Sequence, residues 1–390
     1  MQEKDPRGRY VGAYLFFRNK IELSNINDVS KMEQKRKKGK SKIKFSQSSL
    51  TKKLLGPVPG SLVAGHYTSL PYSCAIYSIV NYMITFIDVV GIQIMCLKVL
   101  PHLLEDEKQR TAAQHAGLTD TVLRAMVLFP HDIDLHTYAF HTLVLLARPL
   151  GKKEGMLLFR RTLLNESRIF KAESRTSMSG IAVMLDSMRR FASSASLQAM
   201  SCWSMVNIAL IPSQKVVLVK LGGISVAANA LFQHPHNAEV QFRALFALIN
   251  LVIPSENLPE NSSEADVIRQ QVGEVNDRSE KEMLEESLDQ VVNLVVVAMR
   301  NFCASEAILN RACLILHNLS LNTSYHKTLL RTPNCFQMLR WCLENYRSDN
   351  VLQKSAGGTL QRLEITLSND DELRAEFVAM HSRARRAAAE

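Results

Sequence analysis

Apolar residues recur three and four positions apart along most of the chain, which is the spacing of amphipathic helices. Residues 118–127 and 224–231 each place apolar side chains on one helical face, and a third such helix is expected from Glu280 onward. Turn-forming residues follow the first two segments, at 130–132 and 234–237. The pattern predicts an all-α fold built from short helices.

One helical segment occurs several times. Residues 197–208 align with residues 240–251 at an offset of 43, and a third copy, 308–319, follows at an offset of 68. The longer offset coincides with an acidic segment that we interpret as an inserted loop. A fourth copy begins at Leu352-Gln353, and weaker copies begin at Leu135-His136 and at Gln93. A period near 43 residues is typical of helical repeat proteins.

A second element recurs between these copies. The triplets Ala116-Gly117-Leu118 and Gly222-Gly223-Ile224 each precede an apolar helix, and residues 332–336 take the same place in the third copy. Together these elements resemble the armadillo repeat, which has roughly 40 residues per unit. In that family a Gly-Gly-Ile-like step precedes the second helix of each unit, and the third helix begins near a Leu-Gln pair.

The resemblance covers about residues 90–370 and implies a right-handed superhelix (solenoid) of three-helix repeats, similar to importin alpha and beta-catenin. It also implies a binding groove for a protein or an extended peptide on the concave face. A HEAT-type solenoid is the nearest structural alternative.

Within each predicted third helix, residues seven positions apart lie within about 20° of each other around the helix axis. The predicted groove residues are Met200, Trp203, Asn207, Arg243, Phe246, Asn250, Arg311, Leu314, Asn318, Ser355 and Arg362. The opposite face is apolar and is expected to be core.

The resemblance to importin alpha gives two of these residue types a role. In such proteins a Trp packs against aliphatic stems of the peptide, and an Asn four residues later bonds its backbone. Trp203-x-x-x-Asn207 matches that motif. A carboxamide can both donate to and accept from an extended backbone. The alternative is that these Asn residues stabilise neighbouring helices and that Trp203 is core. Trp341-x-x-x-Asn345 has the same spacing but belongs to a second helix, so we interpret it as chance.

Charge is concentrated in two blocks. The 390-residue chain has a net charge of +10, but residues 31–53 carry ten Lys or Arg and one Glu, and residues 254–290 carry eleven acidic and three basic residues. The sequence thus predicts a basic, disordered N-terminal arm (1–70), an armadillo-like domain (71–375) with insertions at 150–179 and 254–282, and a basic C-terminal tail (376–390). Arg243 and Arg311 stand where a binder of basic peptides would be acidic, which favours an acidic or phosphorylated ligand.

Residues 75–97 are mostly apolar and long enough to span a bilayer. Asp88 near the middle opposes insertion by about 2.5 to 3.5 kcal/mol. We therefore expect buried helices at the start of the fold, with a membrane-tethered scaffold anchored through 75–97 kept as an alternative.

Catalytic chemistry has no sequence support. Nucleotide-binding, zinc-protease, hydrolase and kinase motifs do not occur, and the seven Cys form no CxxC pair. We expect no catalytic residue, metal or cofactor. The predicted function is a non-catalytic, cytoplasmic or nuclear scaffold that binds proteins or peptides. A nuclear-transport adaptor of importin-alpha type is the second alternative, and nucleic-acid binding is disfavoured.

Overall fold

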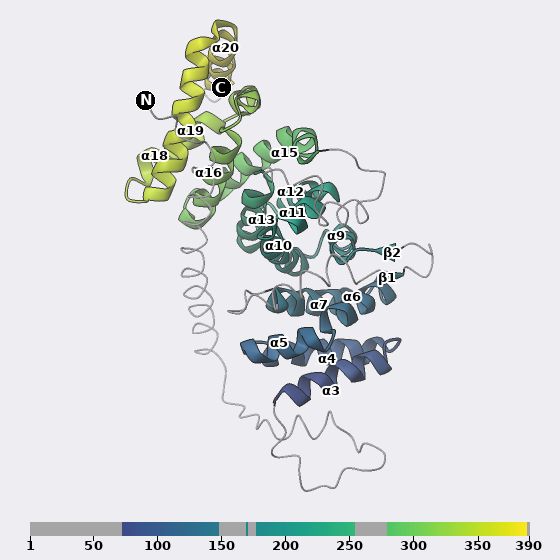
Figure 1. Cartoon of the computed structure of the whole chain (residues 1–390). Coiled ribbons are helices and arrows are strands. Elements are labelled where there is room, and N and C mark those ends of the chain that lie inside the picture. The colour runs from purple at the N-terminus through teal and green to yellow at the C-terminus, as the bar shows by residue number, and fades with distance from the viewer. Residues whose placement is uncertain (1–71, 148–168, 171–176, 254–278, 388–390) are drawn as a thin grey trace, which may run out of the picture. The chain divides into compact units, whose positions relative to one another are not determined.

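The computed structural model describes residues 72–147, 169–170, 177–253 and 279–387, and these residues form an all-α solenoid (Figure 1). The only strands in this part of the chain are β1 (Ile169–Phe170) and β2 (Ser177–Met178), which pair antiparallel. The predicted basic arm 1–70 and most of the two predicted insertions lie outside the described residues. Residues 280–282 of the second insertion form the first turn of a helix.

The helices repeat in the expected order of a three-helix unit (Figure 1). The first helices are α5 (Glu107–His115), α11 (Pro212–Lys220), α17 (His326–Arg331), which follows the 3-10 turn η2 (Thr323–Tyr325), and α20 (Asp371–Ala387). The second helices are α3 (Tyr72–Thr85), α6 (Leu118–Leu128), α9 (Gly180–Arg190), α12 (Gly223–Gln233), α15 (Glu280–Asn301) and α18 (Cys335–Asn345). The third helices are α4 (Val90–Leu103), α7 (Ile133–Leu146), α10 (Ala195–Ala209), α13 (Ala238–Leu251), α16 (Glu306–Leu319) and α19 (Asn350–Asn369).

Each third helix packs on the third helix of the next unit, and the second helices do the same. The predicted boundary at 375/376 falls inside α20, so most of the expected C-terminal tail is helical.

A glutamine near the start of the third helix, buried in three units and half-buried in a fourth, joins this helix to the second helix of its own unit. Its amide nitrogen donates to two backbone carbonyls, ten and seven residues earlier, at 2.8 to 3.1 Å. The residues at this repeat position are Gln93, His136, Gln198, Gln241, Leu309 and Gln353. The carbonyls belong to the end of the second helix, where a helix has no partners of its own for them. The later of the two carbonyls also accepts a backbone N–H of the turn at 3.0 to 3.2 Å, so the amide is a second donor there and supplies the bond that the earlier carbonyl would otherwise lack.

His136 takes the place of this glutamine in the second unit. Its Nε2 lies 3.2 Å from the Phe129 carbonyl oxygen and its Nδ1 lies 2.7 Å from the Ser187 hydroxyl. Burial lowers the pKa of His136 from 6.5 to about 4, so the ring is neutral at pH 7. Because a carbonyl only accepts, the proton is on Nε2, and Nδ1 accepts from Ser187.

A second set of hydrogen bonds joins consecutive units. The donor is a side chain at the end of the second helix of one unit. The acceptor lies in the preceding unit and is the backbone carbonyl six residues before the repeat position of that unit. The four pairs are Arg190 to Pro130 (2.8 Å), His234 to Ala192 (2.8 Å), Asn301 to Pro235 (3.0 Å) and Tyr346 to Cys303 (2.6 Å). The type of donor differs in all four pairs, whereas the accepting carbonyl always has the same repeat position. The carbonyl is therefore the constant element of this contact between units.

The predicted glycine steps are turns between first and second helices. Gly117 and Gly222 have φ of 76° and 88°, and Asn334 takes the same place with φ of 63°. This left-handed region suits Gly and tolerates Asn. Gly223 is required for a different reason, since a Cβ there would lie 2.7 Å from the Leu218 carbonyl oxygen.

The apolar stretch 75–97 forms two helices, α3 and α4, which are separated at residues 86–89 and bury Ile76, Val80, Met83 and Leu97. Within the described ranges, no single helix is both long enough and apolar enough to cross a membrane. One bent pair, α11 and α12 at 68°, meets the length and composition test.

Replacing Gly223 with Ala should lower the free energy of unfolding by about 1 to 3 kcal/mol, because backbone must shift to admit the methyl group. Chemical denaturation measures this. Gly91→Ala is the matched control, since its new methyl group meets no atom within 4 Å and should leave stability equal or slightly higher. Equal stability of the two variants would contradict the packing described for Gly223.

Replacing His136 with Gln should reduce the acid sensitivity of the fold. The folded-state pKa of His136 is about 4 and the unfolded value is near 6.5, so the unfolded chain binds more protons between these limits. Its contribution to stability is therefore lost as the pH falls from 6.5 to 4, by up to about 1.4 kcal/mol per pH unit.

Unfolding free energies measured at pH 7 and pH 5 test this. His136→Gln should shrink the difference between the two pH values, and the reverse change Gln241→His should enlarge it. Parallel pH curves for all three proteins would disprove the assignment.

Candidate functional site

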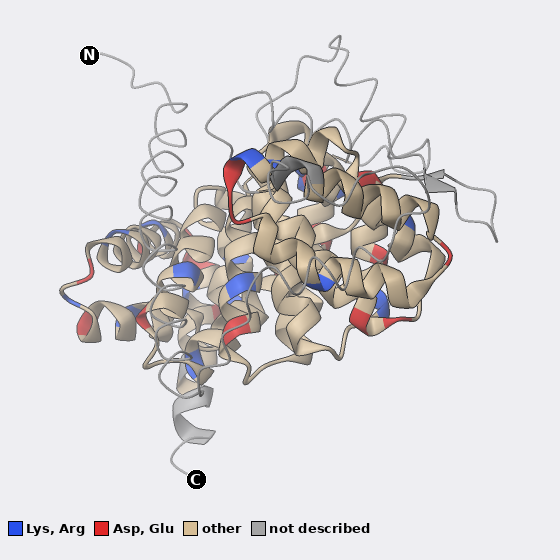
Figure 2. Cartoon of the chain, turned by 90° about the horizontal axis from the view of Figure 1, so that it is seen from below, with Lys and Arg blue, Asp and Glu red and all other residues tan. Residues whose placement is uncertain are grey.

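The third helices present one side chain stripe to solvent, which we call the third-helix face. It consists of the residues two, five and nine positions after the repeat position in α4, α7, α10, α13, α16 and α19. These helices contact one another in that order. Lys and Arg as well as Asp and Glu lie along the stacked helices (Figure 2).

Most of the predicted groove residues do lie on this face. Met200, Trp203, Asn207, Arg243, Asn250, Arg311, Asn318 and Arg362 are all partly exposed. Phe246 is 4% exposed, Leu314 7% and Ser355 4%, so these three lie beneath the surface. They pack under the partly exposed side chains of the face. Their role in binding, like that of the exposed eight, stays a prediction.

Side chains of neighbouring helices contact each other across the face at regular positions. The residue five positions after the repeat position of one helix contacts the residue two positions after the repeat position of the next helix. Trp203 meets Arg243, whose guanidinium carbon lies 5.2 Å from the centre of the indole ring. Phe246 meets Arg311 at 5.0 Å, and Lys98 meets Tyr138 at 5.0 Å. Such cation–π contacts contribute about 0.5 to 2 kcal/mol each.

Phe242 was not predicted from the sequence, yet the Arg311 guanidinium stacks at 3.5 Å on its ring. Trp203 and Phe246 also meet edge to face, with ring centres 6.0 Å apart. The two arginines are therefore held on aromatic surfaces before any ligand arrives.

Arg243 is the most constrained of these cations. It forms an ion pair with Glu239 at 2.6 Å and also donates to the Met200 sulfur at 3.1 Å and to the Ala199 carbonyl oxygen at 3.4 Å. Burial lowers the pKa of Arg243 and the Glu239 carboxylate opposes that shift. A ligand carboxylate could replace Glu239, whose side chain is 57% exposed.

The three predicted asparagines differ in what they bind. Asn318 donates to the Ile249 carbonyl oxygen of the neighbouring helix at 3.4 Å, which is a weak structural bond. The side chains of Asn207 and Asn250 make no hydrogen bond within the described residues, and the buried Asn207 amide nitrogen has no partner there. The sequence had left the structural and the binding role open for all three, and the contacts favour the structural one for Asn318 only.

Arg362, which takes the asparagine position in α19, is engaged with its own chain. Its Nε donates to the Ser320 hydroxyl at 3.0 Å and an Nη donates to His317 Nδ1 at 2.8 Å. Burial and the Arg362 charge lower the pKa of His317 to about 4, so His317 is a neutral acceptor at pH 7.

The other sequence motifs do not lie on the third-helix face. Trp341 and Asn345 belong to the second helix α18, as expected, and the Asn345 amide donates back to the Trp341 carbonyl oxygen at 2.8 Å. In the described part of the chain, no group of three or more His, Cys, Asp or Glu residues could hold a metal ion.

No protein-family model matches the chain, and no curated protein matches it. Solved structures do. A designed armadillo repeat protein shares 14% identity, has a TM-score of 0.52 and is matched over 74% of this chain and 99% of its own. An engineered protein of the Northeast Structural Genomics Consortium shares 17% identity, with a TM-score of 0.51 and coverage of 74% and 96%. The chain has an armadillo-like repeat fold.

Replacing Arg362 with Met should raise the pKa of His317, because it removes a positive charge and a proton donor from Nδ1. The value should stay below 6.5, since burial is the larger cause of the shift. A proton NMR titration that follows the imidazole signals, assigned with His317→Gln, measures it. An unchanged or lower His317 pKa would show that Arg362 does not contact this ring in solution.

Proposed function

We propose that this protein is a non-catalytic scaffold that binds an extended, acidic segment of another protein along the third-helix face. Repeat-solenoid folds are generally protein- or peptide-binding and typically non-catalytic. Their stacked units offer equivalent positions at regular intervals, which suits a ligand with a regularly repeating backbone.

The observation that carries the proposal is the state of Asn207 and Asn250. Both lie at the same position of consecutive units and both are partly exposed. The side-chain amide of neither residue hydrogen-bonds to a described neighbour. An amide without a partner is unfavourable where it is buried, and a peptide backbone would supply both the acceptor and the donor that it needs.

The charge of the ligand follows from Arg243 and Arg311. Each guanidinium has one side against an aromatic ring and is partly exposed. Carboxylates and phosphates are the groups that such fixed guanidinium groups recognise best. The exchange of Glu239 for a ligand carboxylate would leave Arg243 paired throughout.

Two alternatives have less support. A nuclear-transport adaptor for basic peptides would need acidic side chains where Arg243 and Arg311 stand, and α10 carries the single Trp–Asn pair that the described third helices contain. A tether through residues 75–97 would need those residues to leave the contacts that α3 makes with α4, α5 and α6. We place the scaffold in the cytoplasm or the nucleus as part of the proposal.

The test compares Asn207→Ala/Asn250→Ala with Asn318→Ala in the full chain. Arrays of extended 12-residue peptides, one set rich in Asp and Glu and one rich in Lys and Arg, supply the ligands. We expect the acidic set to bind, and the double variant to lose about tenfold or more in affinity, since each lost hydrogen bond contributes about 1 kcal/mol.

Asn318→Ala removes the same group from the same face but should keep affinity within about twofold. Circular dichroism should report equal helix content for all three proteins. Equal binding by the double variant would overturn the proposal, and preferential capture of the basic set would favour the adaptor.

A further inference from the structure

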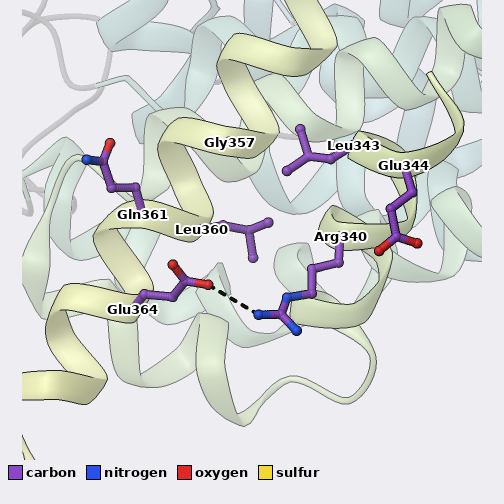
Figure 3. Close-up of a pocket in the computed structure, with 7 residues that line it drawn as sticks. All are labelled: Arg340, Leu343, Glu344, Gly357, Leu360, Gln361 and Glu364. Atoms are coloured by element: carbon purple, nitrogen blue, oxygen red, sulfur yellow. Dashed lines mark hydrogen bonds and ion pairs between the residues drawn. The ribbon is translucent and has the colours of Figure 1, made fainter. Parts of the chain in front are cut away.

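A separate surface lies where the stack of units ends. Between α18 and α19 the described residues leave a hollow of about 370 Å³, which we call the terminal hollow (Figure 3). Leu343 and Leu360 form its apolar part, Arg340, Glu344 and Glu364 carry its charges, and Gly357 of α19 borders it. None of these residues belongs to the third-helix face.

The position of Gly357 is core in every earlier unit, whereas the position of Glu344 is exposed in most of them, as at Ile84 and Phe232. The residue four positions after the repeat position is Leu97, Phe140, Cys202, Leu245 or Cys313, and each is 3% exposed or less because the next unit covers it. After α19 the described chain supplies only α20, a first helix. The terminal hollow is therefore the place where a following unit would pack.

The position of the terminal hollow at the end of the described stack explains part of its polarity. Arg340 stands where earlier units have buried apolar residues such as Val80 and Leu123. It forms an ion pair with Glu364 at 3.4 Å, and the two side chains are 62% and 52% exposed. A polar outer face suits a unit on which no described unit packs.

Gly357 is not explained in this way. A capping role would be met by any polar side chain, whereas a glycine inside a helix costs about 0.5 to 1 kcal/mol relative to alanine. A Cβ at this position would lie 3.8 Å from the nearest atom, Leu343 Cδ2, which is an ordinary contact. Packing within the chain thus does not require glycine here, and its effect is to leave space above the two leucines.

The charges around that space are unbalanced. Glu344 and Glu364 oppose the single cation Arg340, which lies between the two carboxylates in Figure 3 and pairs with Glu364, so the hollow keeps one carboxylate in excess. Lys and Arg side chains combine an aliphatic stem with a cationic end. We propose that the terminal hollow binds a Lys or Arg side chain of a partner protein, with the stem on Leu343 and Leu360 and the cation at the Glu344 carboxylate.

The test uses the full chain and an otherwise uncharged, end-blocked peptide with one central Lys. A carbodiimide joins amines to carboxylates only when they touch, by activating the carboxylate and forming an amide with loss of water. Peptide mapping by mass spectrometry then locates the product. We expect cross-links at Glu344, and none when the peptide carries norleucine in place of Lys.

The matched variants are Gly357→Ala and Gly358→Ala. Both raise helix propensity equally, but the second methyl group points toward His317, 3.4 Å from its ring, and away from the hollow. We expect Gly357→Ala to lower the cross-link yield about threefold or more and Gly358→Ala to leave it unchanged. Glu364→Gln should lower the yield at Glu344, whereas Asp289→Asn, an exposed charge on α15, should not.

Cross-links confined to other carboxylates, or equal yields for the two glycine variants, would overturn the proposal. The site is independent of the third-helix face, so its failure would leave the proposed function untouched.

Discussion

The structure depends on one buried amide that recurs along the chain. In four units a glutamine at the start of the third helix donates to two carbonyls at the end of the second helix. Buried carbonyls need partners: the carbonyl ten residues earlier depends on the amide for its hydrogen bond, whereas the one seven residues earlier also accepts a backbone N–H of the turn. The bond pair therefore fixes the angle between the two helices that form the body of each unit, and a neutral imidazole can replace it in part.

The orientation of the third-helix face follows from that angle. Because every third helix leaves its second helix in the same way, residues at equal positions come to lie side by side on consecutive units. This is how Arg243 reaches the Trp203 ring and Arg311 reaches Phe242. The face thus combines fixed cations with uncommitted amides, while the terminal hollow carries Arg340 at a position that is buried and apolar in earlier units, as at Val80 and Leu123.

Much of the fold could be predicted from the sequence because its signals are local. The Leu-Gln starts and the Gly222-Gly223 step recur at fixed spacing, and both mark turns. The bonds made by the glutamine could not be predicted, nor could the carbonyls of Phe86 and Phe191 that accept them, or the Phe129 carbonyl that accepts from His136. The roles of Asn207 and Asn318 depend on neighbours 40 or more residues away. Because the two residues occupy the same position in their repeats, the sequence alone could not distinguish a structural role from a binding role.

The free energy of unfolding of Gln241→Leu, measured beside Leu309→Gln, tests this account most directly. Leu309 is the leucine that one unit already carries at the repeat position, so the two variants exchange the natural residues. We expect Gln241→Leu to lose about 1 to 3 kcal/mol, because the Leu231 carbonyl loses its partner while the His234 carbonyl keeps only the Asn237 N–H, and Leu309→Gln to be at least as stable as the parent chain. A Gln241→Leu protein as stable as the parent would contradict the account.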